Sequence, residues 1–122
     1  MARILVVDDE LDVVRMVVRA LAARGHQVET ARDGAAALAQ IAQAPPALVI
    51  LDAHLPRVDG PEVCRRLRAA SATRSLPILM MSSAYVSLTD ADAATDVDGY
   101  VMKPFVRETL LAAVDRLLGP TA

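Results

Sequence analysis

The sequence predicts one α/β domain built on a parallel β-sheet with helices on both faces. Five short apolar segments alternate with five segments of helical character along 122 residues, a length typical of a single domain. Three of the apolar segments are continuous rather than alternating, as in strands that are buried on both sides. This alternation favours a doubly wound fold, because right-handed crossovers place helices on both faces of the sheet.

The predicted strands are short apolar runs, and the second is the weakest because two of its four residues are polar. They are Ile4–Val7, Val28–Ala31, Ala47–Leu51, Ile78–Met81 and Tyr100–Met102. In a sheet of this kind, ligands bind beyond the carboxyl ends of the strands, near the switch in strand order. Functional side chains are therefore expected just after these runs.

The first two predicted helices end at glycine or proline. The first spans Leu11 to Arg24 and ends at Gly25. The second follows Asp33-Gly34 and ends before Pro45-Pro46. Apolar residues at helical spacing predict the buried faces. These residues are Val14, Val17, Val18 and Leu21 in the first helix and Ala37, Leu38 and Ile41 in the second.

The remaining helices differ in how clearly the sequence defines them. The third begins at Gly60-Pro61, because proline is favoured at the first helical position. The last spans Val106 to Leu118. The fourth, within Ser87 to Asp98, contains four aspartates and can bury little surface, so we expect it to be short or mobile. The predicted inward residues are Val63, Cys64 and Leu67 in the third helix and Leu110, Val114, Leu117 and Leu118 in the last.

Composition excludes several classes of protein. A net charge of −2, no tryptophan and few other aromatic residues give no basis for nucleic-acid binding. No apolar run approaches the roughly 20 residues of a membrane span, and the N-terminal segment lacks the pattern of a signal peptide. The lone Cys64 excludes an internal disulfide and fits a reducing compartment. We expect a cytoplasmic domain that binds neither nucleic acid nor membrane, with nothing before Met1.

Polar residues suited to phosphoryl chemistry follow four of the predicted strands. They are Asp8 and Asp9 after the first, Asp52 after the third, Ser82 after the fourth and Lys103 after the fifth. Lys103 is the only lysine beside twelve arginines, and an ammonium and a guanidinium are not interchangeable in a tight site. Each of these residues alone could be an ordinary turn or surface residue. Their joint placement at strand ends favours one site.

The chemistry of these side chains predicts a site for a divalent cation and a phosphoryl group. Three adjacent carboxylates repel unless a cation neutralises them, and hard oxygen ligands suit Mg²⁺. Asp52 would attack phosphorus to form an aspartyl phosphate. Lys103 would neutralise one phosphoryl oxygen, and the Ser82 hydroxyl would bond another. We interpret His54 as an exposed side chain that tunes the lifetime of the phosphoaspartate.

Five motifs in order resemble those of the receiver domains of two-component response regulators. The chain is similar to that family in Leu5–Glu10, with its acidic pair, in Leu51–Pro56 around the phosphoacceptor, and in Asp59-Gly60. Pro77–Ser82 resembles the family's fourth strand, which ends in the switch hydroxyl. Tyr100–Phe105 resembles its fifth strand, with the switch aromatic three residues before the lysine. The likeness covers the whole chain.

The resemblance implies a flavodoxin-like (βα)5 fold with strand order 2-1-3-4-5. It implies a receiver domain over residues 1–119, followed by a tail or the start of a linker over 120–122. It implies that Asp52 accepts a phosphoryl group from a sensor histidine kinase or a histidine phosphotransfer protein. By the same resemblance, Asp9, Asp52 and the backbone carbonyl of His54 ligate Mg²⁺, and Asp8 acts largely through water.

The resemblance also implies a conformational switch. Ser82 and Tyr100 would shift together on phosphorylation of Asp52. An output protein or effector domain would then read the face formed by the fourth helix, fifth strand and fifth helix. The Lys103-Pro104 bond is typically cis in this family, and only an X–Pro bond adopts that form at low cost. The domain would catalyse only its own phosphorylation and dephosphorylation, so we do not expect an enzyme in the usual sense.

Some residues depart from the family pattern. Asp96-Val97-Asp98-Gly99 stands before Tyr100, where the family usually has Gly-Ala and two further residues. Ser83 replaces a usual alanine, so either serine could supply the hydroxyl, and register favours Ser82. A phosphatase of the haloacid dehalogenase type would need an aspartate where His54 stands. The other alternative is a pseudo-receiver, never phosphorylated, that serves as a protein interaction module.

Overall fold

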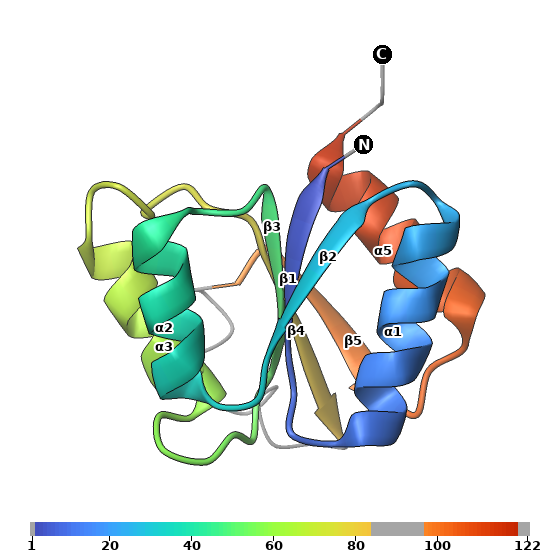
Figure 1. Cartoon of the computed structure of the whole chain (residues 1–122), viewed down its shortest axis with the longest axis horizontal. Helices are drawn as coiled ribbons and strands as arrows, with labels where there is room; N and C mark the ends of the chain where they lie inside the picture. Colours follow the sequence, from blue (N-terminus) through green and yellow to red (C-terminus); the bar gives the residue numbers. More distant parts are fainter. Residues whose placement is uncertain (1, 84–96, 120–122) are drawn as a thin grey trace.

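The computed structural model describes residues 2–83 and 97–119, and its elements follow the predicted alternation (Figure 1). The described strands are β1 (Arg3–Val7), β2 (Gln27–Ala31), β3 (Leu48–Asp52), β4 (Ile78–Ser83) and β5 (Gly99–Lys103). The described helices are α1 (Leu11–Ala23), α2 (Gly34–Gln43), α3 (Gly60–Ala69) and α5 (Arg107–Leu118). The predicted fourth helix lies outside the described residues, except for its last two positions. None of the described helices is long and apolar enough to cross a membrane.

All five strands pair in parallel, in the order β2-β1-β3-β4-β5. This order confirms the expected doubly wound, flavodoxin-like fold. Helices α1 and α5 cover one face of the sheet, and α2 and α3 cover the other (Figure 1). The sheet is therefore the middle layer of three.

Two apolar cores lie on the two sides of the sheet. In β1, Leu5 and Val7 belong to the core under α2 and α3, whereas Ile4 and Val6 belong to the core under α1 and α5. β3 and β4 divide their residues between the two cores in the same way. Because successive side chains of a strand point to opposite faces, a strand buried on both sides requires an unbroken apolar run. This requirement explains the continuous runs in the sequence.

The buried face of α1 differs from the predicted face. Val17 and Leu21 are buried as expected, but Val14 and Val18 are only partly buried. Ala20 is buried in their place, and Val13 and Met16 pack against the core. At 3.6 residues per turn, the positions that do face the core form one arc, and Val14 and Val18 lie beyond its edge. Val13 and Val14 are consecutive, as are Val17 and Val18, so the apolar spacing alone was consistent with two different buried faces.

Side-chain caps and glycines determine where the helices begin and end. An Asp33 oxygen accepts a hydrogen bond from the Ala36 N–H at 2.7 Å, and an Asp59 oxygen accepts one from the Glu62 N–H at 3.2 Å. These bonds satisfy amides that have no partner inside the helix. Gly25 ends α1 as predicted, with a φ of 88° that favours glycine.

Candidate functional site

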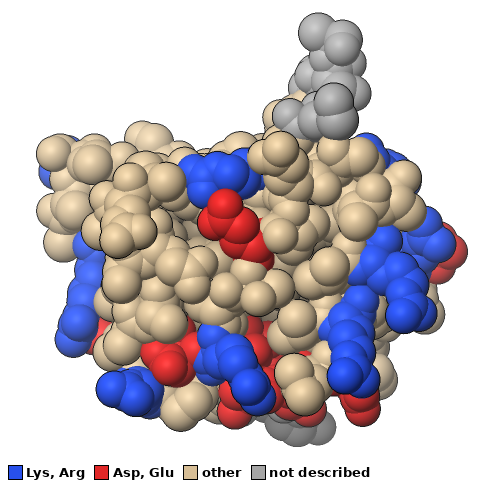
Figure 2. Space-filling model, viewed as in Figure 1, with Lys and Arg blue, Asp and Glu red and all other residues tan. Residues whose placement is uncertain are grey.

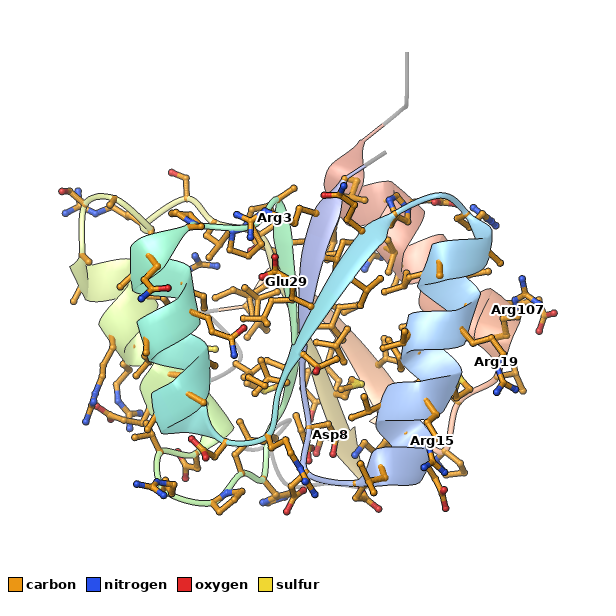
Figure 3. The ribbon with its side chains drawn as sticks, viewed as in Figure 1. Arg3, Asp8, Arg15, Arg19, Glu29 and Arg107 are labelled. Atoms are coloured by element: carbon orange, nitrogen blue, oxygen red, sulfur yellow. The ribbon has the colours of Figure 1, made fainter. Side chains whose placement is uncertain are left out.

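Three of the predicted site residues lie together where the carboxyl ends of the strands meet. Asp8 directly follows β1, Asp52 is the last residue of β3, and Lys103 is the last residue of β5. Figure 3 shows Asp8 beside the start of α1, at the end of β1. The topology of the sheet therefore brings together side chains that are up to 95 positions apart in the chain.

The Lys103 ammonium connects the acidic side chains of this site. Its Nζ lies 2.9 Å from Asp8 Oδ2, 2.9 Å from Glu10 Oε1 and 3.5 Å from Asp52 Oδ2. Burial alone would lower the pKa of Lys103, but its hydrogen bonds to Asp8 and Glu10 and the charge of Asp52 raise that pKa above its ordinary value. Lys103 is therefore a cation throughout the physiological range of pH, as neutralisation of a phosphoryl oxygen requires.

Asp8 is fully buried and bonded on both of its carboxylate oxygens. Oδ1 accepts a hydrogen bond from the Glu10 N–H at 2.9 Å, and Oδ2 accepts one from Lys103 at 2.9 Å. The Asp8 N–H donates to the carbonyl of Ala31 at 3.2 Å, which ties the site to the end of β2. Asp8 thus holds the lysine and the first turn after β1 in one arrangement.

Glu10 is the residue of this cluster that sequence reasoning missed. Its side chain is 62% exposed, yet it accepts a hydrogen bond from Lys103. The available signal was the third consecutive acid in Asp8-Asp9-Glu10. Asp9, which we predicted as a ligand, is exposed and is not among the carboxylates that converge. Its role as a metal ligand stays a prediction.

Asp52 is a buried carboxyl with an unusually high proton affinity. Only 4% of the residue is exposed. Burial, followed by the negative charge of Asp8, raises the pKa of Asp52 from 3.8 to about 6, although Lys103 and the His54 N–H act in the opposite direction. At neutral pH the carboxylate is mostly ionised but poorly solvated. Such a group is suited to act as a nucleophile or to accept a cation.

The donor set fits a small hard cation. One carboxylate oxygen from each of Asp8, Glu10 and Asp52 lies within 4.8 Å of the others. Carboxylate oxygens are preferred ligands of Mg²⁺, which usually binds through one or two carboxylates and keeps several waters. Burial is the main cause of the raised pKa of Asp52, and the negative charge of Asp8 is the second. A bound cation would offset that negative charge.

Two glycines hold the loop that follows Asp52 against the neighbouring helices. A Cβ on Gly60 would lie 2.5 Å from the carbonyl oxygen of Asp52, and one on Gly34 would lie 1.8 Å from that of Val58. Neither position has room for a side chain. Between them, Arg57 adopts a φ of 73°, and the Val58 N–H donates to the Pro56 carbonyl at 2.9 Å. The starts of α2 and α3 therefore determine the path of this loop.

The other predicted site residues are Ser82, Tyr100 and His54. Ser82 is fully buried and follows Met81, which pairs with Asp52, while Tyr100 is partly buried in β5. His54 is exposed, and its N–H donates weakly to Asp52 Oδ1 at 3.4 Å. The Lys103–Pro104 peptide bond is cis. The roles assigned to Ser82, Tyr100 and His54 stay predictions.

Comparison with known proteins places this geometry in context. The family model described as response regulator receiver domain matches residues 4–115. Response regulator MprA of Mycobacterium sp. (strain KMS) is 45% identical over 122 residues, which cover 98% of this chain and 52% of the relative. The chain thus spans about half the length of the curated relatives it matches.

Solved structures of response regulators are similar to this chain as well. Chemotaxis response regulator CheY4 of Vibrio cholerae superposes with a TM-score of 0.90 at 34% identity, covering 96% of this chain and 98% of CheY4. The receiver domain of NtrX from Brucella abortus gives a TM-score of 0.87 at 33% identity, covering 97% and 99% of the two chains.

Proposed function

Because the chain belongs to the family of response regulator receiver domains, we propose that Asp52 is its phosphoacceptor. Membership makes the chain a domain for phosphorylation-dependent signalling and not a classical enzyme. The observation that carries the proposal is the buried Asp52 carboxylate 3.5 Å from the Lys103 ammonium. Nothing in the acceptor chemistry favours a pseudo-receiver.

The proposed reaction transfers a phosphoryl group to an oxygen of Asp52. The carboxylate attacks phosphorus, a new O–P bond forms, and the N–P bond of a donor phosphohistidine breaks and leaves its electron pair on the histidine nitrogen. Lys103 offsets negative charge on the transferred group, and the Ser82 hydroxyl donates to another of its oxygens. Positioning and charge stabilisation account for most of catalysis in such transfers.

We propose Mg²⁺ as the cofactor of this step. Asp9, Asp52 and the His54 carbonyl would be its ligands, with Asp8 acting through water, and Glu10 would balance Lys103 beside them. Bound Mg²⁺ would neutralise carboxylate and phosphoryl oxygens at once. The convergence of Asp8, Glu10 and Asp52 supports a cation at this place.

The partners follow from the family and are proposals for this chain. The donor would be a sensor histidine kinase or a histidine phosphotransfer protein, in the cytoplasm. Phosphorylation would shift Ser82 and Tyr100, and an output protein or effector domain would read the face that includes β5 and α5. We propose residues 1–119 as the receiver domain and 120–122 as a tail or the start of a linker.

Fluoroberyllate, which mimics a phosphoryl group on a carboxylate, tests the acceptor site without turnover. We expect saturable NMR shifts at Asp52, Lys103 and Ser82 in the ¹⁵N-labelled chain, with a requirement for Mg²⁺. The Asp52→Ala variant should show none of them. Saturable shifts that persist in that variant, or their absence from the wild type, would contradict the proposal.

A further inference from the structure

The contact between Glu10 and Lys103 engages the same ammonium that the proposed phosphoryl transfer needs. Glu10 Oε1 accepts a hydrogen bond from Lys103 Nζ at 2.9 Å, and Asp8 Oδ2 accepts one at the same distance. The carboxylate of Asp52 lies farther from the ammonium, at 3.5 Å. The only lysine of the chain therefore makes its two shorter contacts with carboxylates other than the proposed phosphoacceptor.

The two shorter contacts of the lysine differ in how firmly they are held. The side chain of Asp8 is fully buried, and it also accepts a hydrogen bond from the Glu10 N–H. The side chain of Glu10 is 62% exposed. Glu10 directly precedes α1, but its carboxylate makes no capping hydrogen bond to that helix. The contact with Lys103 is therefore what positions the Glu10 carboxylate, whereas Asp8 is fixed independently of the lysine.

The Glu10 side chain has space into which it can turn away from the lysine. A hollow of about 450 Å³ lies beside the contact, and Glu10, Asp12 and Lys103 are among the residues that line it. Because Glu10 is exposed, water can solvate its carboxylate after such a turn. An ion pair this exposed is weak, since solvent screens the attraction and both side chains lose freedom in forming it. A stronger anion close to the ammonium can therefore replace Glu10.

The surroundings of the lysine are acidic, so its charge is already shared. Figure 2 shows acidic side chains gathered along the lower edge of the molecule, with basic side chains among them, and Figure 3 places Asp8 at this edge. An ammonium has three N–H donors, of which Asp8 and Glu10 accept two. A phosphoryl group on Asp52 would add negative charge beside them. It would repel the Glu10 carboxylate and compete with it for the lysine.

We propose that Glu10 is a positioning residue, which restrains Lys103 before phosphorylation and releases it when a phosphoryl group forms on Asp52. The inference rests on the proposed function of Asp52. In the unphosphorylated domain, the hydrogen bond to Glu10 holds the ammonium 3.5 Å from Asp52. A phosphoryl oxygen would then replace Glu10 as acceptor, and the Glu10 carboxylate would turn into water. Breaking the contact uses part of the attraction between the lysine and the phosphoryl group, so Glu10 weakens binding of that group.

Fluoroberyllate binding at saturating Mg²⁺ measures this restraint without turnover. We expect Glu10→Gln to bind fluoroberyllate roughly two- to fivefold more tightly than the wild type, the range that corresponds to an exposed ion pair. Glu10→Asp keeps the charge but has a shorter reach, so it should also bind more tightly. Asp12→Asn is the matched control and should bind like the wild type. It removes an equal charge from the same hollow, but Asp12 is not among the described carboxylates that contact Lys103.

NMR of the single lysine reports on the contact itself. Stability does not isolate it, because a carboxylate also favours the start of α1. In a chain labelled with ¹³C-lysine, every lysine signal belongs to Lys103. We expect Glu10→Gln to move the Cε signal toward its position in the fluoroberyllate-bound wild type, and Asp12→Asn to leave it in place.

The outcomes separate this inference from the proposed function. In a wild type that binds fluoroberyllate, unchanged or weaker binding by Glu10→Gln would overturn the inference alone. So would an unmoved Lys103 signal in Glu10→Gln, or equal tightening by Asp12→Asn, which would show a general effect of charge. Failure of the wild type to bind fluoroberyllate would overturn the proposed function of Asp52 and this inference with it.

Discussion

Replacing Asp52 with asparagine should stabilise the metal-free protein, because the buried carboxylate is ionised at a cost. The pKa of Asp52 is raised from 3.8 to about 6 in the folded chain. The folded state therefore holds this proton more tightly than the unfolded chain. The carboxyl begins to destabilise the fold as pH rises above 3.8, and the effect is complete above about 6. The difference corresponds to about 3 kcal/mol at pH 7.5, with the attraction of Lys103 already included.

Urea unfolding in the presence of a chelator measures this effect. We expect Asp52→Asn to be more stable than the wild type by about 3 kcal/mol at pH 7.5 and by about half as much at pH 5. For a domain of this size the larger value corresponds to a rise in Tm of roughly 10 °C. Asp9→Asn is the matched control, since Asp9 is exposed and its replacement should change stability by less than about 0.5 kcal/mol.

The pH dependence separates this explanation from better packing of an amide. The advantage of Asp52→Asn must shrink as pH falls from about 6 and vanish below 3.8, where the wild-type carboxyl becomes neutral in both states. Millimolar Mg²⁺ should also shrink it, by stabilising the wild type. The reasoning would be refuted if Asp52→Asn were no more stable than the wild type at pH 7.5. It would also be refuted if the gain in stability were the same at pH 7.5 and pH 5.

Five further substitutions test other parts of the site. Asp8→Asn should lower the free energy of unfolding by about 1–3 kcal/mol, because Lys103 loses its fully buried partner; a gain in stability by urea titration would contradict this. Gly34→Ala should cost more than about 2 kcal/mol by the same assay, since the new Cβ meets the Val58 carbonyl oxygen, and a neutral result would show that the loop yields freely. By calorimetry, Asp9→Asn should weaken Mg²⁺ binding roughly tenfold or more and Glu10→Gln should weaken it less; the reverse order would assign the ligand to Glu10. His54→Ala should shorten the lifetime of the phosphorylated protein, followed by loss of phosphoryl mass with time, and an unchanged lifetime would remove His54 from that role.

The fold was predictable because each strand that is buried on both sides is an uninterrupted apolar run in the sequence. Leu48–Leu51 and Ile78–Met81 are apolar without interruption, since each strand contributes to both cores. The phase of α1 was not predictable in the same way. Val14 and Val18 are as apolar as Val13 and Val17, and only packing against the sheet and α5 selects between the two arcs.

The candidate site was predictable as a set of strand ends but not as a geometry. A parallel sheet must bring Asp8, Asp52 and Lys103 to one edge, so their proximity follows from topology. The closer approach of Lys103 to Asp8 and Glu10 than to Asp52 depends on side-chain reach, which sequence spacing does not encode. Glu10 was missed because its contact with Lys103 also depends on side-chain reach. From the sequence alone, an acid after two others is usually a solvated loop residue.

Intact mass after brief incubation with acetyl phosphate and Mg²⁺ tests the central claim most directly. The wild type should gain one phosphoryl group, and neither Asp52→Ala nor the chelator-treated wild type should gain any. No added mass after rapid quenching, or a gain that persists in Asp52→Ala, would contradict the assignment of Asp52 as the phosphoacceptor.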